Sequence, residues 1–256
     1  MSDMTNIQQI KGKWHQLSFY ILSILSLACL SLTGCDSADQ SKSQTQVTKQ
    51  SESTHQRTQP EVDDRPRIVA LGNSLTAGLG VPPNESYPTR LQRRLNQAGY
   101  NYQVINAGVS GDTTAGALRR LDWLLKSQPH IMIIELGAND GLRGQPVKNI
   151  YENLRRIIQG LQQAGVTVLL TGMKIPPNYG AEYTSQFSNI YAQLAEEFHV
   201  AFMPFFLEGV AAHRALNQAD GIHPTGEGYR IIMDNLFEIL EPLLTPAPPP
   251  LHKLDK

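Results

Sequence analysis

The sequence contains very little cysteine. Two of its 256 residues are cysteines, Cys29 and Cys35, and both lie near the N-terminus. Two cysteines at one end cannot form a disulfide framework in the rest of the chain, and no Cys/His cluster has the spacing of zinc ligands. An excess of positive charge is also absent, because the formal net charge is -1 and no long basic run occurs. These absences argue against a disulfide scaffold, a metal site and nucleic-acid binding, which relies on clustered Lys and Arg.

Internal repeats of solenoid length are absent as well. What remains is an ordinary globular composition, with 41% hydrophobic and 18% charged residues. Such a composition favours a folded domain over a disordered chain. We expect that domain to be monomeric and to need no cofactor.

The N-terminal segment reads as an export signal. Lys11 and Lys13 precede an apolar run over 17–32, which is the order found in secretory signals. The next residues, Leu32-Thr33-Gly34-Cys35, resemble the lipobox of bacterial lipoproteins. This resemblance implies cleavage before Cys35 and acylation of that residue, and hence a lipid-anchored protein of the bacterial envelope that faces the periplasm. The alternative is a plain transmembrane anchor, for which the run is short of the usual ~20 residues.

The chain divides into four segments on this reading. A signal peptide over 1–34 precedes the acylated cysteine and a linker over 35–65, which is rich in Ser, Gln, Thr and Lys and has little to bury. A single domain over 66–244 follows. The last segment, 245–256, is rich in proline and is expected to be disordered.

Apolar runs that alternate with helical patterns predict the fold of the domain. Short unbroken runs are typical of strands buried on both faces, as in a parallel sheet. Strands that alternate with helices indicate a doubly wound α/β sandwich, in which ligands bind at the carboxyl ends of the strands. We expect strands over 67–71, 102–106, 131–136, 166–171 and 200–205, and helices over 87–98, 113–126, 147–163, 183–198 and 225–240.

Ser74 follows the first predicted strand, in Gly72-Asn73-Ser74-Leu75-Thr76. A serine hydroxyl becomes a nucleophile when it is exposed on a sharp turn and a base removes its proton, and Gly72 permits such a turn. The alternative role for Ser74 is that of a helix N-cap. After the second strand, Gly108 in Ala107-Gly108-Val109-Ser110-Gly111-Asp112 lets the backbone present its amide to a ligand. Its alternative is a simple turn into a helix.

Two more polar clusters follow later strands. In Gly137-Ala138-Asn139-Asp140, the Asn139 amide can donate to a developing oxyanion, although Asx turns and caps are commoner uses of Asn and Asp. In Asp220-Gly221-Ile222-His223-Pro224, a carboxylate three residues before a histidine can hold Nδ1–H and leave Nε2 to act as a base. A capping Asp with a surface His is the alternative there, and a metal site lacks further His or Cys ligands. All the clusters fall at one edge of the predicted sheet.

The clusters, in this order, resemble the conserved blocks of the SGNH (GDSL-type) serine hydrolases. The likeness is closest to the branch of thioesterase I/lysophospholipase L1 and arylesterase. It implies a three-layer α/β/α sandwich with a five-stranded parallel sheet. It also implies that Ser74 is the nucleophile and that His223 is the base, held by the carboxylate of Asp220. The backbone amides of Ser74 and Gly108 and the side chain of Asn139 are expected to form the oxyanion hole.

One residue departs from the family pattern, since Asn73 stands where the first block has Asp. The α/β-hydrolase elbow fits worse, because it needs Gly two residues after the serine and Thr76 is there. A phosphate loop also fails, because the spacing of Gly72, Gly78 and Gly80 matches neither nucleotide pattern.

The expected activity is hydrolysis of carboxylic esters or thioesters with short to medium acyl chains, as in an arylesterase, acyl-CoA thioesterase or lysophospholipase. It would proceed through an acyl-enzyme on Ser74. The loop 173–179 is expected to line the acyl pocket, although it also fits an ordinary surface loop. Two alternatives are deacetylation of an envelope polysaccharide and a lipid-anchored binding protein without turnover.

Overall fold

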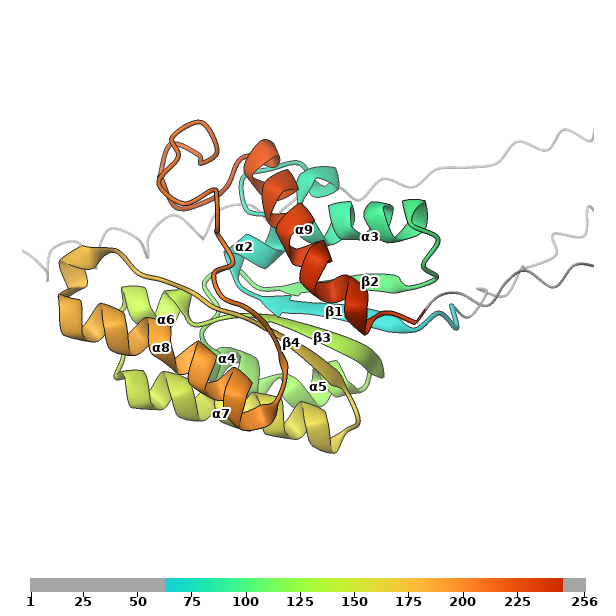
Figure 1. Cartoon of the computed structure of the whole chain (residues 1–256), viewed down its shortest axis with the longest axis horizontal. Coiled ribbons are helices and arrows are strands. Elements are labelled where there is room, and N and C mark those ends of the chain that lie inside the picture. The colour runs from blue at the N-terminus through green and yellow to red at the C-terminus, as the bar shows by residue number, and fades with distance from the viewer. Residues whose placement is uncertain (1–62, 246–256) are drawn as a thin grey trace, which may run out of the picture. The chain divides into compact units, whose positions relative to one another are not determined.

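A computed structural model of the chain describes residues 63–245 (Figure 1). The predicted signal peptide, Cys35 and nearly all of the predicted linker lie outside the described residues, as does the predicted tail from residue 246 onward. Within the described part, a central sheet is covered by helices on both faces (Figure 1). The predicted three-layer α/β/α fold is therefore confirmed.

The sheet has five parallel strands in the order β2-β1-β3-β4-β5, which is the order of a doubly wound fold. The central strands are apolar on both faces; for example, Ile68 and Leu71 of β1 are both fully buried. This burial explains why their sequences read as unbroken apolar runs. The strands are β1 (Arg67–Gly72), β2 (Gln103–Gly108), β3 (Pro129–Glu135), β4 (Thr167–Thr171) and β5 (Ala201–Met203).

Two helices, α3 (Tyr87–Gln97) and α9 (Gly226–Leu240), cover one face of the sheet (Figure 1). The other face is covered by α4 (Thr114–Arg119), α5 (Leu121–Leu125), α7 (Val147–Gln163) and α8 (Ala181–Phe198). Each of the longer helices turns an apolar stripe towards the sheet, as Ile150, Leu154 and Ile158 of α7 do. Short helices follow two of the strands, α2 (Ser74–Ala77) and α6 (Ala138–Leu142), and 3₁₀ turns lie at Pro83–Glu85, Pro177–Tyr179 and Glu241–Leu243.

The helix predicted over 113–126 is two helices, because the backbone of Arg120 leaves the helical region. The Arg120 side chain turns towards the sheet edge, where its Nε lies 2.9 Å from Asp112 Oδ2 and its Nη2 donates to the Gly72 carbonyl at 3.3 Å. The break thus ties the start of this helical layer to the end of β1.

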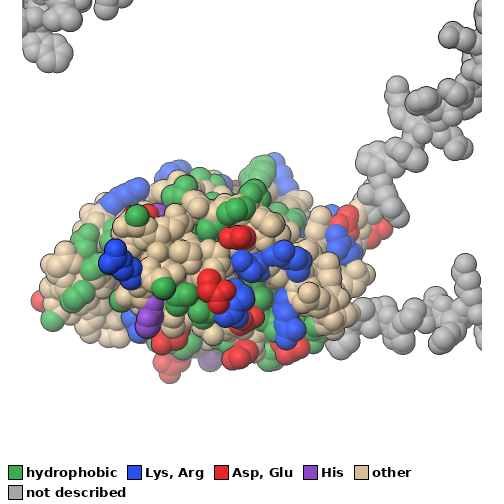
Figure 2. Space-filling view, turned by 90° about the horizontal axis from the view of Figure 1, so that it is seen from above, with side chains coloured by type: hydrophobic (Ala, Val, Ile, Leu, Met, Phe, Trp, Pro, Cys, Tyr) green, Lys and Arg blue, Asp and Glu red, His purple; other side chains and the backbone are tan. Residues whose placement is uncertain are grey.

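On the outer face of the α3 and α9 layer, basic and acidic side chains lie close together, with hydrophobic side chains scattered between them (Figure 2). On α9, Arg230 pairs with Glu227 at 2.7 Å and with Asp234 at 2.6 Å. Such exposed pairs belong to a solvated helix surface and add little stability. Among residues 63–245, no helix combines the length and the apolar character that a bilayer crossing requires.

Candidate active site

Ser74 lies immediately beyond the carboxyl end of β1, as the first residue of α2. The helix is capped by Asn73, whose Oδ1 accepts the Leu75 backbone N–H at 2.9 Å, so the alternative role of Ser74 as the N-cap does not hold. The turn is tight: a Cβ on Gly72 would lie 2.0 Å from Thr76 Oγ1. The Ser74 Oγ lies 2.9 Å from His223 Nε2.

His223 and Asp220 lie on the loop between β5 and α9. His223 Nδ1 lies 2.6 Å from Asp220 Oδ2, while Asp220 Oδ1 accepts the backbone N–H groups of Ile222 and His223 at 3.0 and 3.1 Å. The hydrogen bond from the His223 side chain, aided by these two amides, lowers the pKa of Asp220 to about 2. A carboxylate that remains charged therefore faces Nδ1 and leaves Nε2 towards the serine.

The side chain of Gln218 joins the loop that carries Asp220 and His223 (the histidine loop) to the segment over 74–80 (the serine loop). The Gln218 Nε2 donates to the carbonyls of Leu79 and Pro224 at 2.8 and 2.9 Å, and its backbone N–H donates to the His223 carbonyl at 2.7 Å. The approach to the chain after α2 is close, since a Cβ on Gly80 would lie 2.0 Å from Gln218 Oε1. The two loops are therefore cross-linked beside the pair of Ser74 and His223.

Asn139 lies in α6, directly after β3, and its side chain lines the same cavity as Ser74 and His223. Its Nδ2 donates one hydrogen bond to the Asp112 carbonyl, at 2.9 Å. Since a carboxamide nitrogen carries two hydrogens, the second remains for a ligand. The neighbouring Asp140 is buried and accepts from the backbone and hydroxyl of Thr114, so it anchors α4 and does not face the cavity.

The position predicted for the second backbone donor disagrees with the structure. The Gly108 N–H donates to Asn106 Oδ1 at 2.9 Å, and a Cβ on Gly108 would lie 2.3 Å from the Ala77 backbone nitrogen. Gly108 packs against α2 and does not line the cavity, whereas Gly111 does. Gly111 has a left-handed backbone (φ 81°), and its N–H has no acceptor within residues 63–245. The sequence signal for it was the second glycine of the same block, three residues further on.

The cavity beside Ser74 has a volume of about 550 Å³ and is lined mainly by apolar side chains. Part of the wall comes from the loop after β4, where Met173 and Ile175 are buried, as expected for loop 173–179. Lys174 lies at the same wall with its ammonium 4.4 Å from the centre of the Phe205 ring. The remaining apolar wall includes Leu75, Leu79, Leu142, Leu207 and Ile222.

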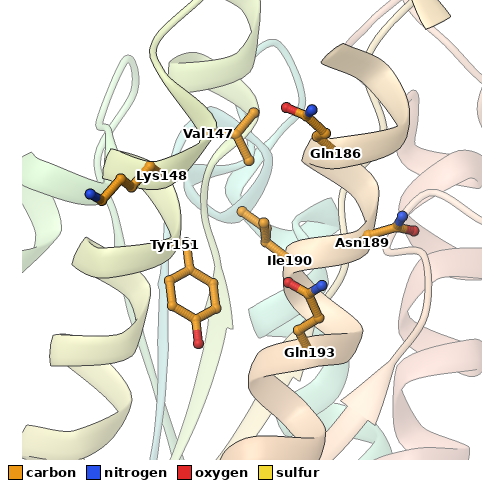
Figure 3. A pocket seen from close by; sticks show the side chains of 7 residues that line it. All are labelled: Val147, Lys148, Tyr151, Gln186, Asn189, Ile190 and Gln193. Carbon is orange, nitrogen blue, oxygen red and sulfur yellow. The ribbon is translucent and has the colours of Figure 1, made fainter. Parts of the chain in front are cut away.

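A second hollow, of about 360 Å³, lies between α7 and α8 (Figure 3). Its side chains come from these two helices and include Lys148, Tyr151 and Gln186. None of the residues from the predicted clusters reaches it. The side chains of the predicted clusters therefore meet at the cavity beside Ser74 and not at the hollow between α7 and α8.

A hydroxyl bonded to an imidazole, whose other nitrogen faces a carboxylate, is the arrangement that activates serine for attack on a carbonyl carbon. Placed at the carboxyl edge of a doubly wound sheet and beside an apolar cavity, it defines a carboxylic ester hydrolase. The sequence pattern of the GDSL-like lipase/acylhydrolase family matches residues 70–231, and the chain belongs to that family.

Known proteins resemble the chain over about two thirds of its length. It is 42% identical to esterase TesA of Pseudomonas aeruginosa over 178 residues, which cover 69% of this chain and 89% of that protein. It is 39% identical to thioesterase 1/protease 1/lysophospholipase L1 of Escherichia coli over 178 residues, 69% of this chain and 84% of that protein. A crystal structure of TesA superposes with a TM-score of 0.68 at 42% identity, covering 70% of this chain and 99% of that one.

Proposed function

We propose that the chain hydrolyses carboxylic esters and thioesters of short to medium acyl chains through an acyl-enzyme on Ser74. The single observation that supports this most is the 2.9 Å contact between Ser74 Oγ and His223 Nε2, backed by the 2.6 Å contact between His223 Nδ1 and Asp220. The geometry needs no rearrangement for proton transfer from the hydroxyl to the imidazole.

In the proposed reaction, Ser74 Oγ attacks the carbonyl carbon while His223 Nε2 takes the hydroxyl proton. The tetrahedral intermediate collapses, and His223 passes the proton to the departing alcohol or thiol, which leaves the acyl group on Ser74. A water molecule then attacks this ester, His223 takes one of its protons, and the carboxylic acid leaves as the proton returns to Ser74. Asp220 balances the charge of the imidazolium in both steps.

The oxyanion hole is proposed to consist of the Ser74 N–H, the Gly111 N–H and the Asn139 side chain. The first N–H groups of a helix have no acceptor within that helix, which leaves the Ser74 amide of α2 available. Gly111 replaces the predicted Gly108, because the amide of Gly108 is bonded to Asn106. One donor of this kind contributes roughly 2.7–4 kcal/mol to stabilisation of the transition state.

The apolar cavity supports acyl chains longer than acetyl. Its volume of about 550 Å³ lies in the range of ligand pockets that bury small molecules. The related proteins named an esterase and a thioesterase/lysophospholipase point to the same substrate class. A polysaccharide deacetylase would bury a single methyl group and leave most of this apolar wall unused.

The location of the enzyme remains a proposal from the sequence. Lys11, Lys13, the apolar run and the motif ending in Cys35 support a lipoprotein signal peptide, acylation of Cys35 and a place in the bacterial envelope facing the periplasm. Several acyl chains on one residue suffice for stable anchoring, since each buried methylene adds about 0.8 kcal/mol.

The test is hydrolysis of p-nitrophenyl butyrate by the Ser74→Ala variant, with Ser188→Ala on α8 as the matched control. We expect the first to lose nearly all turnover, by roughly 10⁶-fold in kcat, and the second to retain it. Labelling with a fluorophosphonate, followed by mass spectrometry, should place the adduct on Ser74. Binding of lipid without labelling would instead support the non-catalytic alternative.

A further inference from the structure

A buried carboxyl group lies beneath the turn that carries Ser74. Glu135 is the last residue of β3, is fully buried, and pairs in register with Gly72 of β1. Its Oε1 accepts from Asn73 Nδ2 at 2.8 Å, and its Oε2 accepts from the Asn73 backbone N–H at 3.2 Å and from Thr76 Oγ1 at 2.9 Å. None of the polar clusters predicted from the sequence contains this residue.

No ion pair compensates the buried carboxyl within residues 63–245, so its partners are hydrogen-bond donors. Burial raises the pKa of Glu135 to about 8, against the effect of these donors. A carboxyl group that is costly to bury and plays no part in the proton transfers calls for another role.

Asn73 uses both ends of its carboxamide. Nδ2 donates to Glu135, while Oδ1 accepts the Leu75 N–H at 2.9 Å and lies 3.4 Å from Ser74 Oγ. A rotated amide would place Nδ2 against the Leu75 N–H and Oδ1 against a carboxyl oxygen. Glu135 therefore decides which end of the amide faces the serine.

We infer that Glu135 is a positioning residue for ester hydrolysis, which fixes the Asn73 carboxamide and through it the Ser74 hydroxyl that faces His223. The inference rests on the proposed role of Ser74 as the nucleophile. The hydrogen-bond donors and acceptors of the two residues match: the amide at position 73 is paired with a carboxyl group at position 135.

This match predicts a different pH dependence of activity for two conservative variants. In Glu135→Gln, one of the two Asn73 donors meets an amide N–H, so the turn loses a bond at every pH. In Asn73→Asp, the carboxyl groups of residues 73 and 135 face each other and need one shared proton. The turn that carries Ser74 is therefore intact only while the two groups share that proton. In the double variant, the new amide at position 135 donates to the new carboxylate at position 73, and the amide oxygen accepts the remaining donors.

The other ionisable groups around Glu135 do not titrate in the relevant range. Tyr87 of α3, Tyr229 of α9 and Tyr191 of α8 all have a pKa raised by burial. They stay neutral, and the alkaline behaviour of the Asn73→Asp variant follows from the carboxyl pair alone. Because a facing carboxylate raises a pKa, that variant should lose activity only above about pH 8.

The experiment measures kcat for p-nitrophenyl butyrate between pH 6 and 10 in the purified protein, with active-site titration by a fluorophosphonate. At pH 7, we expect Glu135→Gln to lose roughly 10- to 100-fold in kcat with little change in KM, because the nucleophile is misplaced. Asn73→Asp should match the wild type at pH 7 and fall at pH 9–10. The double variant should recover to within about threefold at both pH values.

Glu238→Gln, an exposed carboxylate on α9, is the matched control. A Glu135→Gln variant that melts at a lower temperature but keeps wild-type kcat and labelling rate would overturn the inference and reduce Glu135 to a structural role. An additive loss in the double variant would overturn it equally. If Glu135→Gln does not fold, the pH profile of Asn73→Asp decides, and absence of the alkaline loss counts against the inference. Failure of the wild type to label at Ser74 would instead reject the proposed nucleophile.

Discussion

Asp220 holds His223 through both of its carboxylate oxygens, with Oδ2 2.6 Å from Nδ1 and Oδ1 accepting the backbone N–H of the same histidine at 3.1 Å. The second bond fixes the backbone from which the ring projects. The first fixes the ring itself and keeps the proton on Nδ1. The orientation and the tautomer of the His223 ring are thus set by one side chain.

Replacement of Asp220 by Asn should lower kcat by roughly 10³–10⁴-fold, because an amide can donate to Nδ1 and force the proton onto Nε2. The matched control is Asp234→Asn, in an exposed ion pair on α9. Since the pKa of Asp220 is lowered to about 2, its carboxylate is charged at every pH above that value. Protonation of Asp220 should therefore not contribute to the acidic loss of wild-type kcat/KM, whose slope should correspond to one proton. A slope of two protons would contradict this.

Replacement of Asn139 by Ala should lower kcat by roughly 10²–10³-fold with KM nearly unchanged, because the side chain acts on charge that develops in the transition state. Asn189→Ala, at the hollow between α7 and α8, should leave both constants as they are. Steady-state kinetics on an ester and a thioester would measure this. An equal effect of the two variants would contradict the assignment of the oxyanion hole.

The two glycines of the second block should respond differently to Ala. A Cβ at position 108 would meet the backbone of Ala77 at 2.3 Å, so Gly108→Ala should cost about 1–3 kcal/mol of stability or more. At position 111 the space is open, and the left-handed backbone costs only about 1–2 kcal/mol. For Gly111→Ala, we expect kcat to fall because the amide turns away from the cavity. Denaturant unfolding and kcat, measured together, would test the contrast.

The acyl preference should follow the volume of the cavity. As long as each methylene added to the acyl chain contacts the apolar wall of the cavity, kcat/KM should rise about fourfold per methylene. This rise corresponds to about 0.8 kcal/mol per methylene. Ala211→Phe, which adds bulk at the cavity, should move the optimum of a p-nitrophenyl ester series to shorter chains. Ala215→Phe, on the same loop but outside the lining, serves as the control. An unchanged optimum in the first variant would mean that the acyl group lies elsewhere.

Membrane attachment should depend on one of the two cysteines. Cys35→Ser should abolish incorporation of radiolabelled palmitate and release the protein from the membrane fraction, whereas Cys29→Ser should leave both unchanged. Activity of the released protein on a soluble ester should be retained. Persistent palmitate on the Cys35→Ser variant would refute the lipoprotein proposal.

The sequence predicted the strands well because burial on both faces leaves an unbroken apolar run, as in Ile131 to Ile134. It predicted one helix over 113–126 because the spacing of Leu118, Leu121 and Leu125 continues across Arg120, whose departure depends on a tertiary contact with Asp112. Propensity and periodicity do not record such contacts.

The meeting of Ser74 and His223 in one site was predictable, because their motifs carry recognisable side chains. The choice between Gly108 and Gly111 was not predictable, because both residues permit a close approach and only the fold shows which of them lines the cavity. The sequence did not predict Glu135 as a site residue, because a single acidic residue in an apolar strand gives no sign of its partners. The bond between Glu135 and Asn73 links residues 62 positions apart in the chain.

The cross-link by Gln218 has a consequence for the newly made chain. The serine loop is complete early in synthesis, but the residue that bridges it to the histidine loop lies 139 positions beyond its acceptor at Leu79. Because Asp220 and His223 also follow the last strand, a chain synthesised only as far as β5 lacks the base proposed to activate Ser74. We expect such a chain to leave esters intact until its final segment has been made and has docked on the serine loop.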